Sequence, residues 1–255
     1  MTVDLFMFMG QSNMAGRGIT SPEHPEGVPE LIPGAGYEYR AVSSPDKLCE
    51  LSEPFGTTED RPGGIDDCNM KTGSMVTAFV NEYYKLTGVP VVGVSASKGG
   101  SVIGEWQPEG IYLTDAIKRL EAAVGFLEVN NYVIRHKYML WCQGESDGDA
   151  KTSGDVYKKR FFAMLSEMKS HGIEKCFTVK TGHYNGGMDY TYDEIRAAED
   201  EIEEIDPDVI MVSTVLGEMK VRGLMKDAFH YFQQAYNEVG KDAGINTAGY
   251  VMKQL

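Results

Sequence analysis

The sequence lacks the features that identify metalloproteins, redox proteins and membrane proteins. Only four cysteines occur in 255 residues, and none forms a Cys-x-x-Cys pair, so neither a zinc site nor a redox motif is indicated. No apolar run approaches the length of a membrane-spanning helix. The apolar stretch at 5–9 is too short for a signal peptide and has no basic flank. We therefore expect a cytoplasmic protein, or a secreted one if a leader has been removed.

Basic residues are also scarce. The 24 Lys and Arg residues are outnumbered by 38 Asp and Glu residues, which gives a net charge of −14. Such a chain repels phosphate backbones and anionic lipid, so nucleic acid and membrane partners are not expected. The five histidines are scattered without ligand spacing, so we expect no metal and no cofactor. The oligomeric state is not indicated.

The cysteines divide into two pairs. Cys142 and Cys176 lie inside strand-like runs and are expected to be small buried hydrophobic residues. Cys49 and Cys68 share one irregular region, where they can pair if the protein is exported.

Apolar runs alternate with amphipathic segments along the chain. The runs are nearly continuous, as in parallel strands covered on both faces, and they predict strands at 3–9, 89–97, 137–143, 175–182 and 208–214. Helical spacing of apolar residues predicts helices over 73–87, 113–128, 153–170, 191–205 and 231–243. The alternation predicts an α/β fold, with helices on both faces of a five-stranded parallel sheet, as a single domain over 1–255.

One segment, from about 20 to 71, breaks this pattern. It has little periodicity and contains seven of the ten prolines. Loops of this length in a compact domain are usually functional or disordered. Because it directly follows the first strand and its turn, we interpret it as an insertion on the face that carries the site. The alternative is a surface loop without a role.

Polar residues follow each predicted strand. In open parallel sheets, ligands bind beyond the carboxyl ends of the strands. The residues found there are those of a hydrolase: Gln11 and Ser12, Gly99 and Gly100, Gln143 and Glu145, His183, and further on Asp227 and His230.

These residues suit nucleophilic catalysis. A serine hydroxyl needs a neighbouring base, which His230 can supply for Ser12. Asp227, three residues before this histidine, can hold the other ring nitrogen. The N–H groups of Ser12 and Gly100 and the amide of Gln143 can stabilise an oxyanion. His183 is the competing base.

Other motifs with glycines near a polar residue do not match the stretch "GQSNMAGRG". A phosphate-binding loop needs four residues between its glycines and then Lys-Ser/Thr, whereas Gly10 and Gly16 are separated by five residues and followed by Arg17. The dinucleotide fingerprint GxGxxG is absent. The nucleophile elbow GxSxG is also absent, because "GQSNM" lacks its second glycine.

Four blocks resemble the SGNH-hydrolase superfamily, and within it the sialate O-acetylesterase-like group that includes carbohydrate esterase family 6 and acetylxylan esterases. They are "GQSNMAGRG", "SKGGSVIGEW", "QGESD" and "DAFHYFQQAYNEVG", in the family's order. The resemblance implies a flavodoxin-like three-layer α/β/α fold and a serine esterase that deacetylates sugars through an acyl-serine. The usual Gly-x-Asn-Asp block is replaced by Gln143-Gly144-Glu145. Whether Asp227 or Glu145 orients His230 is therefore open.

Three further residues are candidate substrate contacts: Gln11, Trp106 and His183, although Trp106 is as well explained as a core residue. The predicted partner is an acetylated carbohydrate. Xylan, sialic acid and other glycans all fit, because specificity would lie in the segment 20–71. The alternative function is a carbohydrate-binding module that has lost catalysis, which an intact Ser, His and Asp set argues against.

Overall fold

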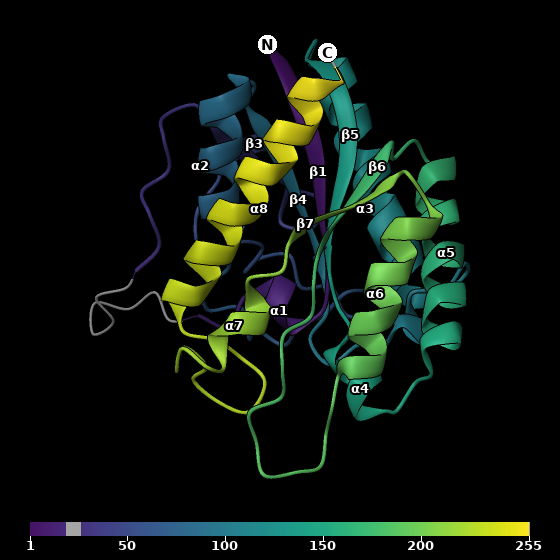
Figure 1. Ribbon diagram of the computed structural model, residues 1–255. Helices are drawn as coiled ribbons and strands as arrows, with labels where there is room; N and C mark the ends of the chain where they lie inside the picture. The colour runs from purple at the N-terminus through teal and green to yellow at the C-terminus, as the bar shows by residue number, and fades with distance from the viewer. Residues whose placement is uncertain (19–26, 255) are drawn as a thin grey trace.

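The computed structural model of the chain describes residues 1–18 and 27–254, which form a central sheet between two layers of helices (Figure 1). The start of the predicted insertion, residues 20–26, lies outside the described residues. The strands are β1 (Thr2–Gly10), β2 (Gly36–Arg40), β3 (Ser44–Glu50), β4 (Val91–Ser97), β5 (Val133–Cys142), β6 (Lys175–Val179) and β7 (Val209–Ser213). The helices are α1 (Ser12–Ala15), α2 (Val76–Thr87), the 3₁₀ turn η1 (Ile103–Glu105), α3 (Ile111–Val129), α4 (Glu145–Asp149), α5 (Gly154–Ser170), α6 (Asp193–Ile205), α7 (Leu216–Met219) and α8 (Gln233–Lys253).

The sheet has the strand order β3-β2-β4-β1-β5-β6-β7. The five predicted strands are β1, β4, β5, β6 and β7, and each pairs in parallel with its neighbours in this set. The α/β class and the parallel arrangement are thus confirmed. The predicted number of strands is wrong, because the sheet has seven.

The two additional strands, β2 and β3, lie in the segment that was predicted to be irregular. β2 pairs in parallel with β4, and β3 pairs antiparallel to β2 at the edge of the sheet. The sequence of β3, "SPDKLCE", is polar and largely exposed. A charged, proline-containing strand is typical of a sheet edge, where unpaired backbone groups invite aggregation. β3 therefore lacks the hydrophobic run by which a strand is predicted from sequence.

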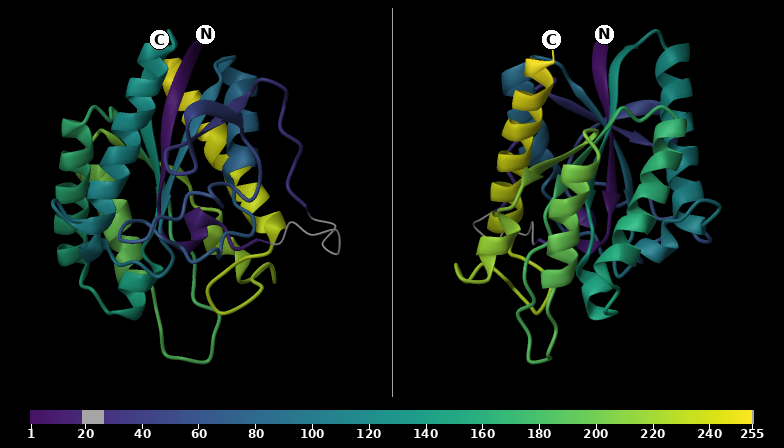
Figure 2. Two further views of the ribbon diagram at one scale, coloured as in Figure 1. Left: turned by 180° about the vertical axis from the view of Figure 1, so that it is seen from behind. Right: turned by 45° about the vertical axis from the view of Figure 1, so that its right-hand side comes forward.

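The core consists of two layers of side chains, one on each face of the sheet. Alternate residues of β1 point to opposite faces, so that Val3, Leu5, Met7 and Met9 pack towards α3, α5 and α6, whereas Phe6 and Phe8 pack towards α2 and α8. Figure 2 shows these three layers in its right-hand view, with α2 and α8 on one side of the sheet and α3 and α5 on the other. Burial on both faces explains why the strand runs are continuously apolar.

The predicted helices are all present, with ends shifted by up to three residues except for α8. This last helix extends to Lys253, ten residues beyond the predicted end. Its second half has Gly, Thr and Asn residues that favour helices weakly. Small residues of this half are nevertheless buried on the same side of the sheet as α2: Ala243, Gly244, Thr247 and Ala248. Packing therefore overrides propensity here.

The chain order places a crevice beside β1. After β1 the chain builds β2, β3 and β4 on one side of it and then crosses to β5 on the other side. The carboxyl ends of β4, β1 and β5 meet at this point, which is where ligands bind in open α/β sheets. Figure 1 shows α1 and several long loops at this end of the sheet. Among the described residues, no helix is long and apolar enough to cross a membrane.

Candidate active site

Ser12 lies at the carboxyl end of the central strand, as the first residue of α1. The preceding Gly10 has a φ of 138°, and a Cβ atom there would lie 2.1 Å from the carbonyl oxygen of Cys142. Only glycine allows this turn so close to β5. The glycine thus lets the chain leave the strand sharply and present Ser12 at the crevice.

Ser12, His230 and Asp227 form a continuous hydrogen-bonded relay. His230 Nε2 lies 3.0 Å from Ser12 Oγ, and His230 Nδ1 lies 3.0 Å from Asp227 Oδ2. The Asp227 carboxylate is fixed in turn, because its Oδ1 accepts the N–H groups of Phe229 and His230 at 2.8 Å each. The structure thus brings a serine, a histidine and an aspartate into the hydrogen-bonded arrangement that can activate a serine hydroxyl.

The charges of this relay suit a base that works near neutral pH. Burial disfavours the imidazolium and is the main reason that the pKa of His230 lies below its usual value; Asp227 opposes this shift, and Arg17 adds to it. Burial also disfavours the Asp227 carboxylate, but the N–H groups of Phe229 and the contacts with His230 outweigh it and lower the pKa of Asp227. His230 is therefore neutral, and Asp227 charged, at pH 7.

A cleft of about 340 Å³ opens over Ser12 and His230. The β1–α1 turn, the insertion, the end of β4, α4 and the loop before α8 all contribute to its wall. The lining residues are Gln11, Ser12, Asn13, Arg17, Asp67, Cys68, Met70, Lys98, Gly99, Gly100, Glu145, Ser146, Asp149, Phe229 and His230.

Two backbone N–H groups at the cleft can receive a negative charge. Ser12 begins α1, so its N–H has no partner within the helix. Gly100 lies between two engaged neighbours, since Gly99 N donates to Asp67 Oδ1 and Ser101 N donates to Lys98 O. The Gly100 N–H itself has no acceptor within residues 1–18 and 27–254. Both groups belong to residues that line the cleft.

The side chain of Gln143 is not where the sequence prediction requires it. It is fully buried and does not line the cleft. Its Nε2 donates to Ser101 O at 3.0 Å and to Asp147 Oδ2 at 2.6 Å, so both amide hydrogens are engaged. The predicted oxyanion role of the Gln143 amide is therefore contradicted. The sequence shows that an amide follows β5 but not that it turns inward to brace the loop at Ser101.

Gln11, unlike Gln143, has a side-chain amide that faces the cleft. Its Oε1 accepts the N–H groups of Gly144 and Ser146 at 3.2 Å each, which fixes the side chain. Its Nε2 has no acceptor within the described part of the chain, and Gln11 lines the cleft. The prediction that Gln11 contacts substrate therefore agrees with its position.

Glu145 lines the cleft but has no hydrogen bond to His230. Its Oε1 accepts Asn13 Nδ2 at 2.5 Å, and burial raises its pKa. Asn13 also donates to Phe229 O at 3.3 Å and accepts Tyr236 Oη–H at 2.6 Å. Glu145 thus contacts the turn after Ser12 through Asn13, which also bonds the loop that carries His230, whereas Asp227 is the acid that lies against the imidazole.

Two predicted substrate contacts lie elsewhere. Trp106 is fully buried in the core, where its Nε1 donates to Ser101 Oγ at 2.9 Å and its ring packs edge-on against Trp141. This contradicts a direct contact with substrate, and the core alternative is correct. His183 follows β6 as expected but does not line the cleft. Neither residue has a signal in the sequence that distinguishes an inward from an outward orientation.

Several residues of the cleft were missed as site candidates, most notably Asp67, Cys68 and Met70 from the insertion. Their segment has no periodicity that predicts its position; only its departure beside Ser12 pointed to the site. Arg17 forms a buried ion pair with Asp67 at 2.7 Å. Cys68 and Cys49, which share the irregular region of the sequence, are both free thiols. Within residues 1–18 and 27–254, no cluster of three potential metal ligands occurs.

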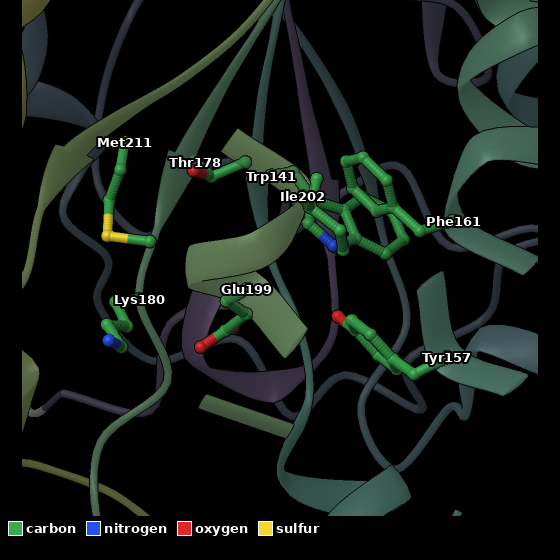
Figure 3. A pocket seen from close by; sticks show the side chains of 8 residues that line it. All are labelled: Trp141, Tyr157, Phe161, Thr178, Lys180, Glu199, Ile202 and Met211. Atoms are coloured by element: carbon green, nitrogen blue, oxygen red, sulfur yellow. The ribbon is translucent and has the colours of Figure 1, made fainter. Parts of the chain in front are cut away.

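A second, small cavity of about 10 Å³ lies on the α5 and α6 side of the sheet (Figure 3). Side chains of β5, β6 and β7 and of the two helices line it, and none of them lines the cleft over Ser12. Its basic and acidic members are Lys180 and Glu199. Burial raises the pKa of Glu199 to about 8, although hydrogen bonds from Thr181 oppose the shift. Glu199 is therefore mostly protonated at pH 7.

Solved structures share this fold. A protein from Arabidopsis thaliana superposes with a TM-score of 0.65 at 21% identity, over 98% of each chain. A carbohydrate acetylesterase from Xanthomonas citri gives a TM-score of 0.62 at 15% identity, over 96% of this chain and 55% of the other. An acetyl-xylooligosaccharide esterase from Geobacillus stearothermophilus gives 0.51 at 12% identity, over 96% and 94%. These similarities establish that the chain shares its α/β fold with these proteins. A search of curated proteins gave no match.

The family follows from the sequence match. Residues 2–246 match the model of the SASA family, described as carbohydrate esterase, sialic acid-specific acetylesterase. The chain belongs to this family, and the resemblance of its four blocks is confirmed. It is accordingly a hydrolase of ester bonds.

Proposed function

We propose that the protein is a serine esterase that removes O-acetyl groups from carbohydrates through an acyl-serine intermediate. The observation that carries the proposal is the relay Ser12–His230–Asp227 at the floor of an open cleft, with hydrogen-bond distances of 3.0 Å at both steps. Membership of a carbohydrate esterase family supports the substrate class. The intact relay argues against a binding module without catalysis.

The first half-reaction forms the acyl-enzyme. Ser12 Oγ attacks the acetyl carbonyl while His230 Nε2 takes its proton, and Asp227 stabilises the imidazolium that results. The negative charge that develops on the carbonyl oxygen is received by the N–H groups of Ser12 and Gly100. The Gln11 Nε2 amide, which is fixed through its carbonyl, supplies a third donor in place of Gln143.

Collapse of the tetrahedral intermediate completes the acyl-enzyme: the carbon–oxygen bond to the sugar breaks, and His230 gives its proton to the leaving sugar oxygen. The second half-reaction releases acetate. Water then enters, His230 takes one of its protons, and the hydroxide attacks the acetyl-serine carbonyl. Collapse of this second intermediate returns the proton to Ser12 and frees acetate.

The test is acetate release from a panel of acetylated carbohydrates, including acetylated xylo-oligosaccharides and O-acetylated sialic acids. We expect release by the wild type. Ser12→Ala and His230→Ala should each lower kcat by about 10⁴–10⁶, because members of a catalytic unit act together. Near-normal turnover by either folded variant, or no release by the wild type from any member of the panel, contradicts the proposal. The panel also identifies the preferred sugar.

A further inference from the structure

We infer that Asp67, from the insertion, is a positioning residue that holds the Gly99–Gly100 loop and thereby aims the Gly100 N–H into the cleft. The inference rests on the proposed esterase function. It gives the insertion a part in the chemical step, in addition to any part in substrate choice.

The contacts of Asp67 join three segments that are far apart in the sequence. Asp67 Oδ1 accepts the Gly99 N–H at 2.6 Å and Arg17 Nη2 at 3.0 Å. Its Oδ2 lies 2.7 Å from Arg17 Nη1. Both side chains are buried, with 2% of Asp67 and 5% of Arg17 exposed. A charge-assisted, two-point pair of this kind fixes geometry as well as contributing energy.

The Gly99–Gly100 loop is shaped to receive this pair. A Cβ atom on Gly99 would lie 2.3 Å from Arg17 Nη2 and 2.7 Å from Asp67 Oδ1. Glycine is therefore required for the close approach. Gly100, by contrast, faces open space, because a Cβ atom there would meet nothing within 4 Å. One N–H of the loop is thus held by Asp67, and the next one is left for a ligand.

The backbone around Asp67 is itself fixed before any substrate arrives. Asp60 accepts the N–H groups of Asp67 and Asn69 at 3.0 and 2.8 Å, and its carboxylate pairs with the buried Lys71 at 3.1 Å. Cys68 and Asn69 both have left-handed backbone conformations, with φ of 53° and 57°. Such conformations persist only where surrounding contacts enforce them, and they gather at functional sites. The insertion is therefore rigid where it meets the cleft.

These observations explain why an acid from the insertion lies so deep in the site. Arg17 follows the helix of the nucleophile, and its charge lowers the pKa of His230. Asp67 forms an ion pair with Arg17, and its Oδ1 also accepts the N–H of Gly99. Loss of Asp67 should therefore weaken the stabilisation of the oxyanion while it leaves the ground-state binding of substrate almost unchanged.

The experiment compares Asp67→Ala, Asp67→Asn and a control, Asp46→Ala, which removes an exposed acid of the same insertion. Activity is measured as kcat and KM for p-nitrophenyl acetate and for the best acetylated carbohydrate, after thermal unfolding has shown that each variant is folded. We expect Asp67→Ala to lower kcat by about 10²-fold, near the scale for losing one oxyanion donor, with KM within about twofold. Asp67→Asn keeps an oxygen that can accept the Gly99 N–H, so it should recover at least tenfold of the loss.

Two results for Asp67→Ala overturn the inference: a kcat within threefold of the wild type, or a loss that appears in KM alone. An asparagine variant as poor as the alanine variant also overturns it, because the acceptor would then not be the cause. If Asp67→Ala does not fold, Asp67→Thr replaces it, since a hydroxyl on the shorter side chain does not reach Gly99. An inactive wild type is a different outcome, which rejects the proposed function itself.

Discussion

Replacing Asp227 by asparagine changes one of the two oxygens that lie near His230 Nδ1, which are Oδ1 at 3.1 Å and Oδ2 at 3.0 Å. Asp227 Oδ1 accepts two backbone N–H groups at 2.8 Å, so the asparagine carbonyl will occupy that position. The NH₂ group must then take the place of Oδ2, 3.0 Å from His230 Nδ1. An amide that donates to Nδ1 leaves the ring proton on Nε2, where it blocks transfer from Ser12. The imidazolium also loses its counter-charge.

The expected magnitude is large. A wrong tautomer of the catalytic histidine costs about 10⁴ in kcat in the best-known serine hydrolase, which is about 5.4 kcal/mol of transition-state stabilisation. Glu145→Gln is the matched control, because it makes the same carboxyl-to-amide change at another residue that lines the cleft. Its carbonyl can still accept Asn13 Nδ2, and Glu145 has no hydrogen bond to His230. We expect its kcat to stay within about tenfold of the wild type.

The assay is the initial rate of acetate release by the two single variants and the double variant, each with its unfolding temperature. Independent roles predict that the losses in the double variant add, since residues with separate partners usually do. A severe loss in Glu145→Gln together with a mild one in Asp227→Asn would refute the reasoning. The orienting acid would then be Glu145.

Further predictions concern the amides of Gln11 and Gln143 and the carboxyl group of Glu199. Gln11→Ala should lower kcat by about 10²–10³ with little change in KM, because it removes one oxyanion donor. Gln143→Ala should instead lower the free energy of unfolding by about 1–3 kcal/mol, because it leaves buried partners unsatisfied. Steady-state kinetics and urea unfolding measure the two effects, and a kinetic loss in Gln143→Ala with a stability loss in Gln11→Ala would contradict the assignment. The pKa of Glu199 is about 8 in the folded protein, and its ordinary value is 4.5. Between these pH values the native state binds one proton more than the unfolded state. The free energy of unfolding therefore falls as the pH rises through this window, by up to about 1.4 kcal/mol per pH unit. Glu199→Gln should flatten this slope in urea unfolding measured between pH 5 and pH 8.5, and an unchanged slope would show that Glu199 is not its cause.

Much of the architecture could be predicted because its signals are local. The five central strands are buried on both faces, so each one is a nearly uninterrupted apolar run. The rule that ligands bind beyond the carboxyl ends of parallel strands then placed Gln11, Ser12 and Gly100 at one edge of the sheet. Asp227 and His230 were within reach of each other on one short turn, and the structure joins them at 3.0 Å.

The features that could not be predicted depend on the orientation of side chains and on contacts between residues that are far apart in the sequence. Gln143 follows the end of β5, and Trp106 lies in the connection between β4 and α3, but both side chains turn inward and contact Ser101. β2 and β3 have too few apolar residues to stand out. Asp67 is separated by 50 residues from Arg17 and by 32 from Gly99, and nothing in an irregular segment predicts which backbone it will meet.

The most direct test of the account is to trap the nucleophile. The wild type is incubated with a serine-directed organophosphonate, digested, and mapped by mass spectrometry, with His230→Ala treated in parallel. The account predicts one adduct, on Ser12, that forms with loss of esterase activity and fails to form at a comparable rate without the His230 base. An adduct on another residue, or equal labelling of Ser12 in His230→Ala, would contradict the claim that the relay activates Ser12.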